Sequence, residues 1–176
     1  MRRFWFGGTR RSDPVREAAE RLHAASVVAA RDPALYVDQG APDTVEARFE
    51  LLTAHVILLV QRLGSAGAQG AAIRQGLFDA YIGHLDGAMR EMGVGDISMG
   101  RRMKGLGEAF YGRARAYDRA FARLPDTADF SALIGRSILA GVQADPAPLA
   151  ETLLRRRSAL AAAPDDALLH GEVQWS

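Results

Sequence analysis

Cysteine is absent from this sequence of 176 residues, which excludes a disulfide scaffold, a thiolate metal site and a thiol nucleophile. Lysine is almost absent too, because Lys104 is the only lysine among 22 basic residues and the others are arginine. A GC-rich coding sequence is the simplest cause of that bias. No apolar run approaches the roughly 18 residues that a membrane-spanning helix needs. The best run, residues 54–60, is short and contains His55.

Strand patterns and nucleotide-binding motifs are also missing. No segment alternates apolar and polar residues over a useful length. The turn at residues 93–96 is no dinucleotide fingerprint, because no strand precedes it and a third glycine is lacking, and the chain has no Walker-type phosphate loop. The four histidines lie on different predicted elements, so each is expected at the surface or satisfied in the core. We therefore predict no catalytic site, no cofactor, no metal and no enzymatic activity.

Helical periodicity, by contrast, runs through nearly the whole chain. The length favours one domain with a sizeable core, and the pattern predicts an all-α, single-domain bundle of about six helices around an antiparallel helical hairpin. One helix is expected to begin at Pro14, capped by Asp13, and another at a capping box of Asp43 and Glu46. The other expected elements are an irregular connection over 31–43, a loop over 64–70, the two hairpin helices on either side of 93–96, and helices over 128–143, after Pro146 and within 165–176.

The hairpin is predicted from two apolar stripes joined by a short turn. Its second helix contains several glycines, each of which costs about 1 kcal/mol relative to alanine. Close helix packing is the favoured reason for Gly112, whereas Gly105 and Gly107 have no firm explanation. The stripes are Ile73, Leu77, Tyr81, Leu85, Ala88 and Met92, then Met99, Met103, Leu106, Phe110, Ala114, Tyr117 and Phe121.

Charge is unevenly distributed although the net charge is only +1. Residues 32–96 hold nine acids and four arginines, hence −5, whereas residues 97–123 hold seven basic residues and two acids, hence +5. The positive face suits lipid headgroups, nucleic acid or an acidic protein, although solvated arginines on an ordinary helix are the commoner explanation. Residues 1–12 form a separate basic and aromatic arm, in which Phe4, Trp5 and Phe6 either contact a membrane or pack onto the domain.

Several strings, taken together and in order, resemble the ubiquinol–cytochrome c chaperone family. The resemblance covers the chain from roughly Tyr36 onward and is densest over 75–117. Two departures from the family pattern are Ala47, where glycine is usual, and the extra glycines within 103–107. The matching strings are REMGVGD at 90–96, AFYGR at 109–113 with Tyr117, GAPDTV at 40–45 with Arg48 and Phe49, QGLFD at 75–79 and LHG at 169–171.

The resemblance implies a non-catalytic assembly chaperone over residues 13–176 that binds newly made cytochrome b for the respiratory bc1 complex at the membrane. It also implies the ribosome or a small helical protein as further partners. Without a long presequence and with its arginine bias, the chain is expected to be bacterial, and to lie in the cytoplasm or peripherally on the cytoplasmic face of the inner membrane. The expected partner contacts are Arg90, Glu91, Asp96, Arg101, Arg102, Tyr111 and Arg113.

Alternatives remain at this point. Glu91, Asp96 and Arg113 could equally buttress the hairpin through caps and ion pairs. The domain could instead be a ribosome- or nucleic-acid-binding adaptor that uses the basic face of 97–123. It could also be an enzyme whose site is defined by shape and carries no motif.

Overall fold

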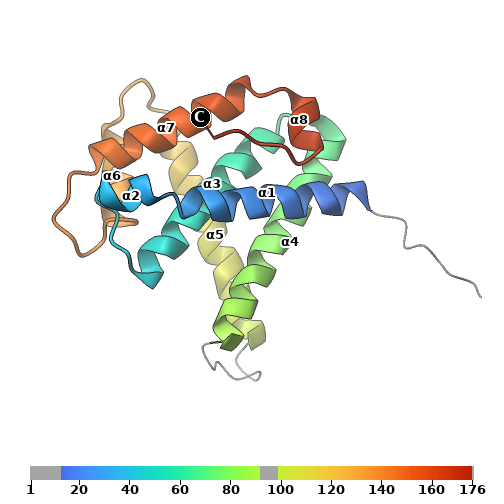
Figure 1. Ribbon diagram of the computed structural model, residues 1–176, viewed down its shortest axis with the longest axis horizontal. Helices are drawn as coiled ribbons and strands as arrows, with labels where there is room; N and C mark the ends of the chain where they lie inside the picture. Colours follow the sequence, from blue (N-terminus) through green and yellow to red (C-terminus); the bar gives the residue numbers. More distant parts are fainter. Residues whose placement is uncertain (1–12, 92–98, 176) are drawn as a thin grey trace, which may run out of the picture.

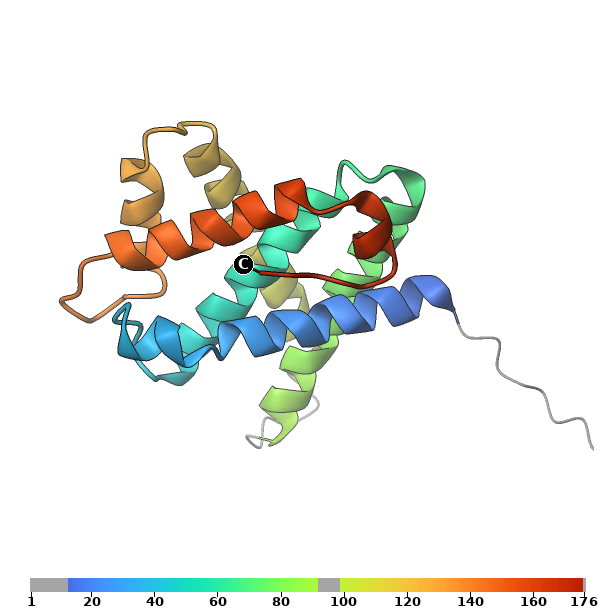
Figure 2. The same ribbon diagram turned by 45° about the horizontal axis from the view of Figure 1, so that its top comes forward.

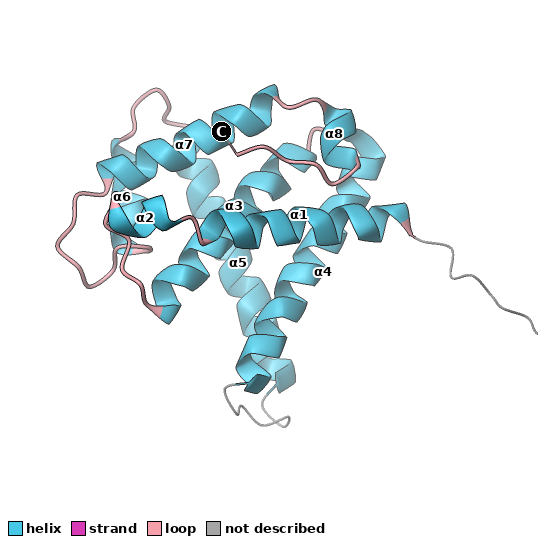
Figure 3. Cartoon of the chain, in the orientation of Figure 1, coloured by secondary structure: helices cyan, strands magenta, loops and turns pink. Residues whose placement is uncertain are grey.

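The computed structural model describes residues 13–91 and 99–175, with the backbone alone for 99–104, and in this part of the chain all regular structure is helical (Figures 1 and 3). Six helices have nine residues or more, which confirms the predicted all-α bundle of about six helices. No helix in these residues is both long and apolar enough to cross a membrane. The helices are α1 (Pro14–Ala30), α2 (Pro33–Val37), α3 (Val45–Leu63), α4 (Gly67–Glu91), α5 (Met99–Phe121), α6 (Ala128–Arg136), α7 (Ala147–Ala162) and α8 (Asp165–Leu169).

Helix α3 forms the centre of the bundle. Every residue from 51 to 59 is buried, so this helix has no solvent-facing side over more than two turns. A helix that is apolar all round must be covered on all sides, and α1, α4, α5 and α7 all pack against α3. Helices α1 and α7 cross it on one side in Figures 1 and 2.

Short polar signals set the helix starts. Asp13 caps α1, as predicted, by accepting a hydrogen bond from the Val15 amide at 3.1 Å. The predicted capping box at Asp43 and Glu46 is wrong, because Thr44 is the cap and accepts from the Ala47 amide at 3.2 Å. Asp43 instead pairs with the side chain of Arg48 at 2.5 Å. The cap is thus one residue later than expected.

Two predicted segments differ from the structure. The connection over 31–43 contains the short helix α2, which Asp32 begins by accepting from the Ala34 amide at 3.1 Å. The helix expected over 128–143 ends at Arg136, where the Ser137 hydroxyl donates to the Leu133 carbonyl at 2.7 Å. The chain then continues in turns that still bury Ile138 and Leu139. Burial of these apolar residues therefore does not require the helix to continue.

Helices α4 and α5 pair in opposite directions, as the hairpin prediction requires. Phe110 of α5 lies between two α4 residues, with ring centroids 5.2 Å from Phe78 and 5.3 Å from Tyr81. Both views show the end of α4 and the start of α5 projecting beyond the other helices (Figures 1 and 2). The hairpin is therefore packed at one end and extends from the bundle at the other.

The glycines in these helices do not share one role. A Cβ added at Gly112 or Gly105 would meet no atom within 4 Å, so the expectation of close packing at Gly112 is wrong. A close approach between α1 and α4 does occur at Gly76 of α4, where an added Cβ would lie 2.9 Å from the Cβ of Ala19 on α1. Gly76 thus permits the contact between α1 and α4.

Alanine substitutions at Gly76 and Gly112 should change stability in opposite directions. Gly112→Ala should raise the free energy of unfolding by about 0.5–1 kcal/mol, because alanine is the better helix former and has open space there. Gly76→Ala should lower it by about 1–3 kcal/mol, because the new methyl group overpacks the helix crossing. Urea unfolding followed by circular dichroism measures both, and changes of the same sign would contradict the packing difference.

Candidate functional site

A groove of about 530 Å³ lies between the ends of α1 and α4, the short helix α2, the start of α3, and α5. Its lining is mostly apolar, while charged and titratable groups contribute part of its wall. A hollow of this size and character is typical of a binding site. The apolar lining is Val27, Ala30, Tyr36, Val45, Phe49, Leu52, Leu85, Ala88, Met89 and Leu106; the polar lining is Arg31, Glu46, Arg48, Glu50, His84 and Arg113.

The groove arises because the apolar stripe of α4 is longer than the surface that covers it. Ile73, Leu77 and Tyr81 of this stripe are fully buried, whereas Leu85 and Ala88, one and two turns later, are only half-buried. These last two turns belong to the projecting end of the hairpin. Apolar surface that would be covered in a closed bundle therefore remains available to another molecule.

Helix α3 supplies the opposite wall. Val45 and Phe49 are four residues apart and so lie on one face of the first turns of this helix. Val45 is 67% exposed, which is unusual for a large apolar residue, and Phe49 is half-buried. The start of α3 thus directs apolar side chains outward, unlike its fully buried middle.

One ion pair crosses the groove wall between α3 and α5. The Nε of Arg113 donates to both carboxylate oxygens of Glu50, at 2.8 and 3.0 Å, and its Nη2 donates to Glu50 as well. The guanidinium carbon also lies 5.2 Å from the ring centroid of Phe49. The hydrogen bonds that Arg113 donates to Glu50 raise the pKa of Arg113, so the guanidinium keeps its charge beside this carboxylate. The wall therefore offers a fixed, paired charge and no free carboxylate at Glu50.

A hydrogen-bonded chain supports this wall from behind. The Thr53 hydroxyl donates to the Phe49 carbonyl at 2.7 Å, and the Tyr81 hydroxyl lies 2.8 Å from the same Thr53 oxygen. Burial raises the pKa of Tyr81 to about 12, and burial also raises that of Tyr117. Both phenols are therefore neutral at ordinary pH, and uncharged hydrogen-bonded groups lie behind this wall of the groove.

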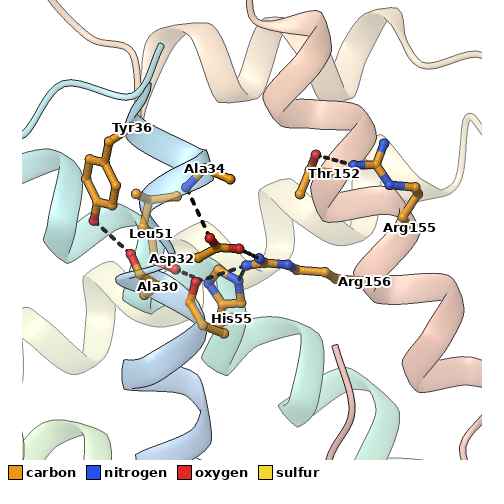
Figure 4. A network of polar contacts seen from close by, with 10 residues as sticks. Ala30, Asp32, Ala34, Tyr36, Leu51, His55, Thr152, Arg155 and Arg156 are labelled. Carbon is orange, nitrogen blue, oxygen red and sulfur yellow. Dashed lines mark hydrogen bonds and ion pairs between the residues drawn. The ribbon is translucent and has the colours of Figure 1, made fainter. Parts of the chain in front are cut away.

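A second network holds the corner between α1 and α2 (Figure 4). From α7, Arg156 donates to the Ala29 carbonyl at 3.0 Å and to the Asp32 carboxylate at 2.6 Å, and it also reaches His55 of α3. His55 is fully buried, and its Nδ1 donates to the Leu51 carbonyl at 2.7 Å. Since a carbonyl only accepts, Nε2 of His55 is the atom that accepts from Arg156. Burial lowers the pKa of His55 to about 3, so this imidazole is neutral.

This corner carries part of the groove lining. The Tyr36 hydroxyl donates to the Ala30 carbonyl at 2.7 Å, and both residues line the groove. Sequence reasoning missed the network, although Arg156 lies on the same face of its helix as Leu149, Leu153 and Leu160. An arginine on an apolar stripe indicates a buried partner, but the stripe does not indicate which one.

The structure separates the contact residues predicted from sequence. Arg113 lines the groove. Arg90 and Glu91 are exposed at the end of α4, where Arg90 pairs with Asp86 at 2.8 Å. Tyr111 is 50% exposed and packs against Phe78 at 5.3 Å between ring centroids. Asp96, the side chains of Arg101 and Arg102, and the membrane-contact candidates Phe4, Trp5 and Phe6 lie outside the described residues.

The histidines do not assemble into a metal centre in the described part of the chain, where no three His, Cys, Asp or Glu side chains are grouped for one. His23 and His84 form a pair between α1 and α4, with ring centroids 5.2 Å apart. Burial, and then the neighbouring His84, lower the pKa of His23. His84 lines the groove, so the pair lies beside its apolar wall.

No curated protein matches the chain. A crystal structure described as the Cbp3 homolog from Brucella abortus superposes with a TM-score of 0.83 and is 30% identical in sequence, over 93% of this chain and 91% of that one. The family model for ubiquinol-cytochrome C chaperones matches residues 37–175, a stretch that runs from the end of α2 to the last described residue and includes most of the groove. The chain therefore belongs to the ubiquinol–cytochrome c chaperone family, as its sequence strings predicted.

Proposed function

We propose that this protein is a non-catalytic assembly chaperone of the respiratory bc1 complex and that it binds newly made cytochrome b in the groove. Family membership supports a chaperone role. The observation that carries the proposal is the groove itself, whose apolar walls from α3 and α4 are not covered by any described part of the chain. The site of action is the cytoplasm or the cytoplasmic face of the inner membrane.

The groove suits an apolar helical segment as its occupant. A membrane protein must keep spans of about 20 apolar residues from aggregating before they enter the bilayer. A groove of about 530 Å³ takes only a few side chains of such a span. Helix-in-groove recognition works in this way, through anchors at positions i, i+3 or i+4, and i+7. The client is thus gripped over about two turns and can be released onto its final partners.

The paired charges also favour this kind of client. Because Glu50 and Arg113 satisfy each other, covering them with an apolar segment leaves no lone buried charge. The remaining walls present side chains such as Leu85 and Met89 that adjust to different contact shapes. Binding then depends on apolar area and needs no ATP or other cofactor.

Deletion of the gene should lower both the content of the bc1 complex and the stability of cytochrome b. Normal levels of both would remove the chaperone proposal. This experiment tests the role but not the groove, so a variant of the groove is needed as well.

Val45 offers a matched pair of variants with Val37. Both are exposed valines at or near the same corner, with 67% and 80% of their surface accessible, but only Val45 lines the groove. Val45→Glu should reduce the amount of cytochrome b that copurifies with the protein at least about tenfold, because the client would have to bury an unpaired carboxylate. Val37→Glu should copurify normally.

Since both positions are exposed, neither variant should change the temperature of unfolding appreciably. If both variants copurify as much cytochrome b as the unchanged protein does, the client binds elsewhere. If both lose the same amount of cytochrome b, the loss is a charge effect unrelated to the groove.

A further inference from the structure

A second surface, formed where α5 ends and α6 packs beside it, is rich in arginine. An open depression of about 430 Å³ is lined by Arg119 of α5, by Arg123 in the turn after α5 and by Arg136 of α6; these three arginines are here called the arginine patch. The other lining residues are Ala116, Ala120, Ala122 and Asp129. Since three of these are alanines, the guanidinium groups surround a shallow floor of small side chains.

The arginine patch is not used to hold the fold together. Within the described residues, Arg119 and Arg136 are exposed and take part in no hydrogen bond or ion pair. Arg123 makes only a long contact of 3.5 Å with Asp129, and both side chains are well over half exposed. In contrast, Arg62, Arg113 and Arg156 bind carboxylates or carbonyls at ordinary hydrogen-bond distances. Exposed arginines without partners keep their full capacity to bind an external anion.

The spacing of these arginines brings like charges close together. Arg115 and Arg119 are four residues apart on one face of α5, about 6 Å along its axis, and Arg123 follows after another four residues, in the turn beyond the helix end. Like charges at this spacing destabilise a helix by a few tenths of a kcal/mol per pair. An anion placed over the patch would remove this repulsion and gain planar, bidentate hydrogen bonds, which phosphate oxygens accept well.

Anionic lipid fits the patch better than nucleic acid does. The positive surface is compact, because Asp118, Asp126 and Asp129 are exposed on the same segment of chain and limit its extent. A nucleic acid strand would continue past the arginines onto these acids. The chain as a whole has a net charge of +1 and a pI near 8.2. Nucleic-acid-binding domains typically have a pI above about 9.

We propose that the arginine patch at the end of α5 and on α6 binds the phosphate groups of anionic membrane lipids. The proposal extends the role at a membrane given above, but lipid binding itself does not depend on the client. Helix α5 carries part of both surfaces, since Arg113 lines the groove and Arg119 of the patch lies six residues later, about 9 Å along the helix axis. A patch held on headgroups therefore keeps the groove close to the bilayer that the client must enter.

The test uses the full-length protein and sedimentation with vesicles. Phosphatidylcholine vesicles with added phosphatidylglycerol should bind the protein, binding should weaken as salt is raised, and pure phosphatidylcholine should bind it much less. The triple variant Arg119→Gln, Arg123→Gln, Arg136→Gln should partition into the anionic vesicles about a hundredfold more weakly, because each arginine near such a surface contributes about fivefold. Arg119→Gln alone should lose about fivefold and serves if the triple variant unfolds.

A charge-matched control separates the patch from the net charge. Arg16, Arg21 and Arg74 are also exposed, on α1 and α4, so replacing these three by glutamine removes the same charge from elsewhere. This control should bind anionic vesicles within a few-fold of the unchanged protein. Equal losses in both triple variants would overturn the proposal, as would undiminished binding by the patch variant.

Two other results would also overturn the lipid assignment. Equal binding to neutral vesicles would indicate apolar insertion, for example by Phe4, Trp5 and Phe6, in place of headgroup recognition. Tighter binding to a single-stranded RNA probe than to anionic vesicles, lost in the patch variant, would assign the patch to nucleic acid. Neither result would bear on capture of the client, which the Val45 and Val37 variants test separately.

Discussion

Replacing Arg156 by methionine should lower the free energy of unfolding by about 3 kcal/mol, one of the two largest effects that we expect from a change in this protein. The guanidinium is only 9% exposed and joins α7 to Asp32, to the Ala29 carbonyl and to His55. Methionine keeps the apolar stem of the side chain but leaves these acceptors without a donor, and breaking a buried pair in this way is costly. The melting temperature should fall by roughly 6–12 °C in a domain of this size.

The neighbouring Arg155 provides the control. It is exposed and its side chain reaches only Thr152, at 2.6 Å. Arg155→Met should therefore cost less than about 1 kcal/mol. Similar losses in the two variants would show that the network of Arg156 contributes no more than an ordinary surface contact.

The loss of stability in acid should depend strongly on His55. Its pKa is lowered to about 3 by burial, whereas the unfolded chain protonates this residue at about 6.5. Between these two values the unfolded state binds a proton that the folded state does not, so folding stability decreases as the pH falls. The contribution of the neutral His55 to the free energy of unfolding is complete above about pH 6.5 and is progressively lost towards pH 3. From about pH 7.5 to about pH 4.5 the loss is roughly 3 kcal/mol.

The variant His55→Gln isolates this contribution, because glutamine does not titrate and its amide oxygen can still accept from Arg156. Urea unfolding of both proteins across this pH range gives two curves of stability against pH. The variant should lose about 3 kcal/mol less than the unchanged protein over the interval. His23, whose pKa is also lowered, is present in both proteins and cancels in the difference. Parallel curves would mean that His55 does not stay neutral in the folded state.

Both experiments bear on function through the groove. The network of Arg156, His55 and Asp32 fixes the corner where α1 gives way to α2, and Ala30, Arg31 and Tyr36 at this corner line the groove. A variant that loosens the corner should thus weaken client binding without touching a contact residue. Client capture that survives in Arg156→Met at a temperature where the variant is folded would limit the groove's working part to α3, α4 and α5.

The site predicted from sequence overlaps the groove only in part. The strings around residues 90–96 and 109–113 led to the hairpin, and the hairpin does form one side of the groove. Within that set, however, Arg113 is bound to Glu50 and Arg90 to Asp86, so each is already engaged inside the chain. Whether the expected residues contact a partner remains a prediction. Leu85, Ala88 and Leu106 of the groove belong to the predicted apolar stripes of the hairpin, but a stripe does not reveal where its cover ends.

The sequence by itself determined what depends on neighbours within a few turns: the helices, most of their starts, the hairpin and the family. Apolar spacing and capping residues act over three or four positions, so they can be read from one chain without coordinates. The tertiary structure alone decided which helix is fully enclosed and where apolar surface is left open. It also decided which polar side chains meet across the sequence, 63 residues apart for Glu50 and Arg113 and 101 residues apart for His55 and Arg156. Those contacts depend on how helices cross, and many crossings are compatible with the same stripes.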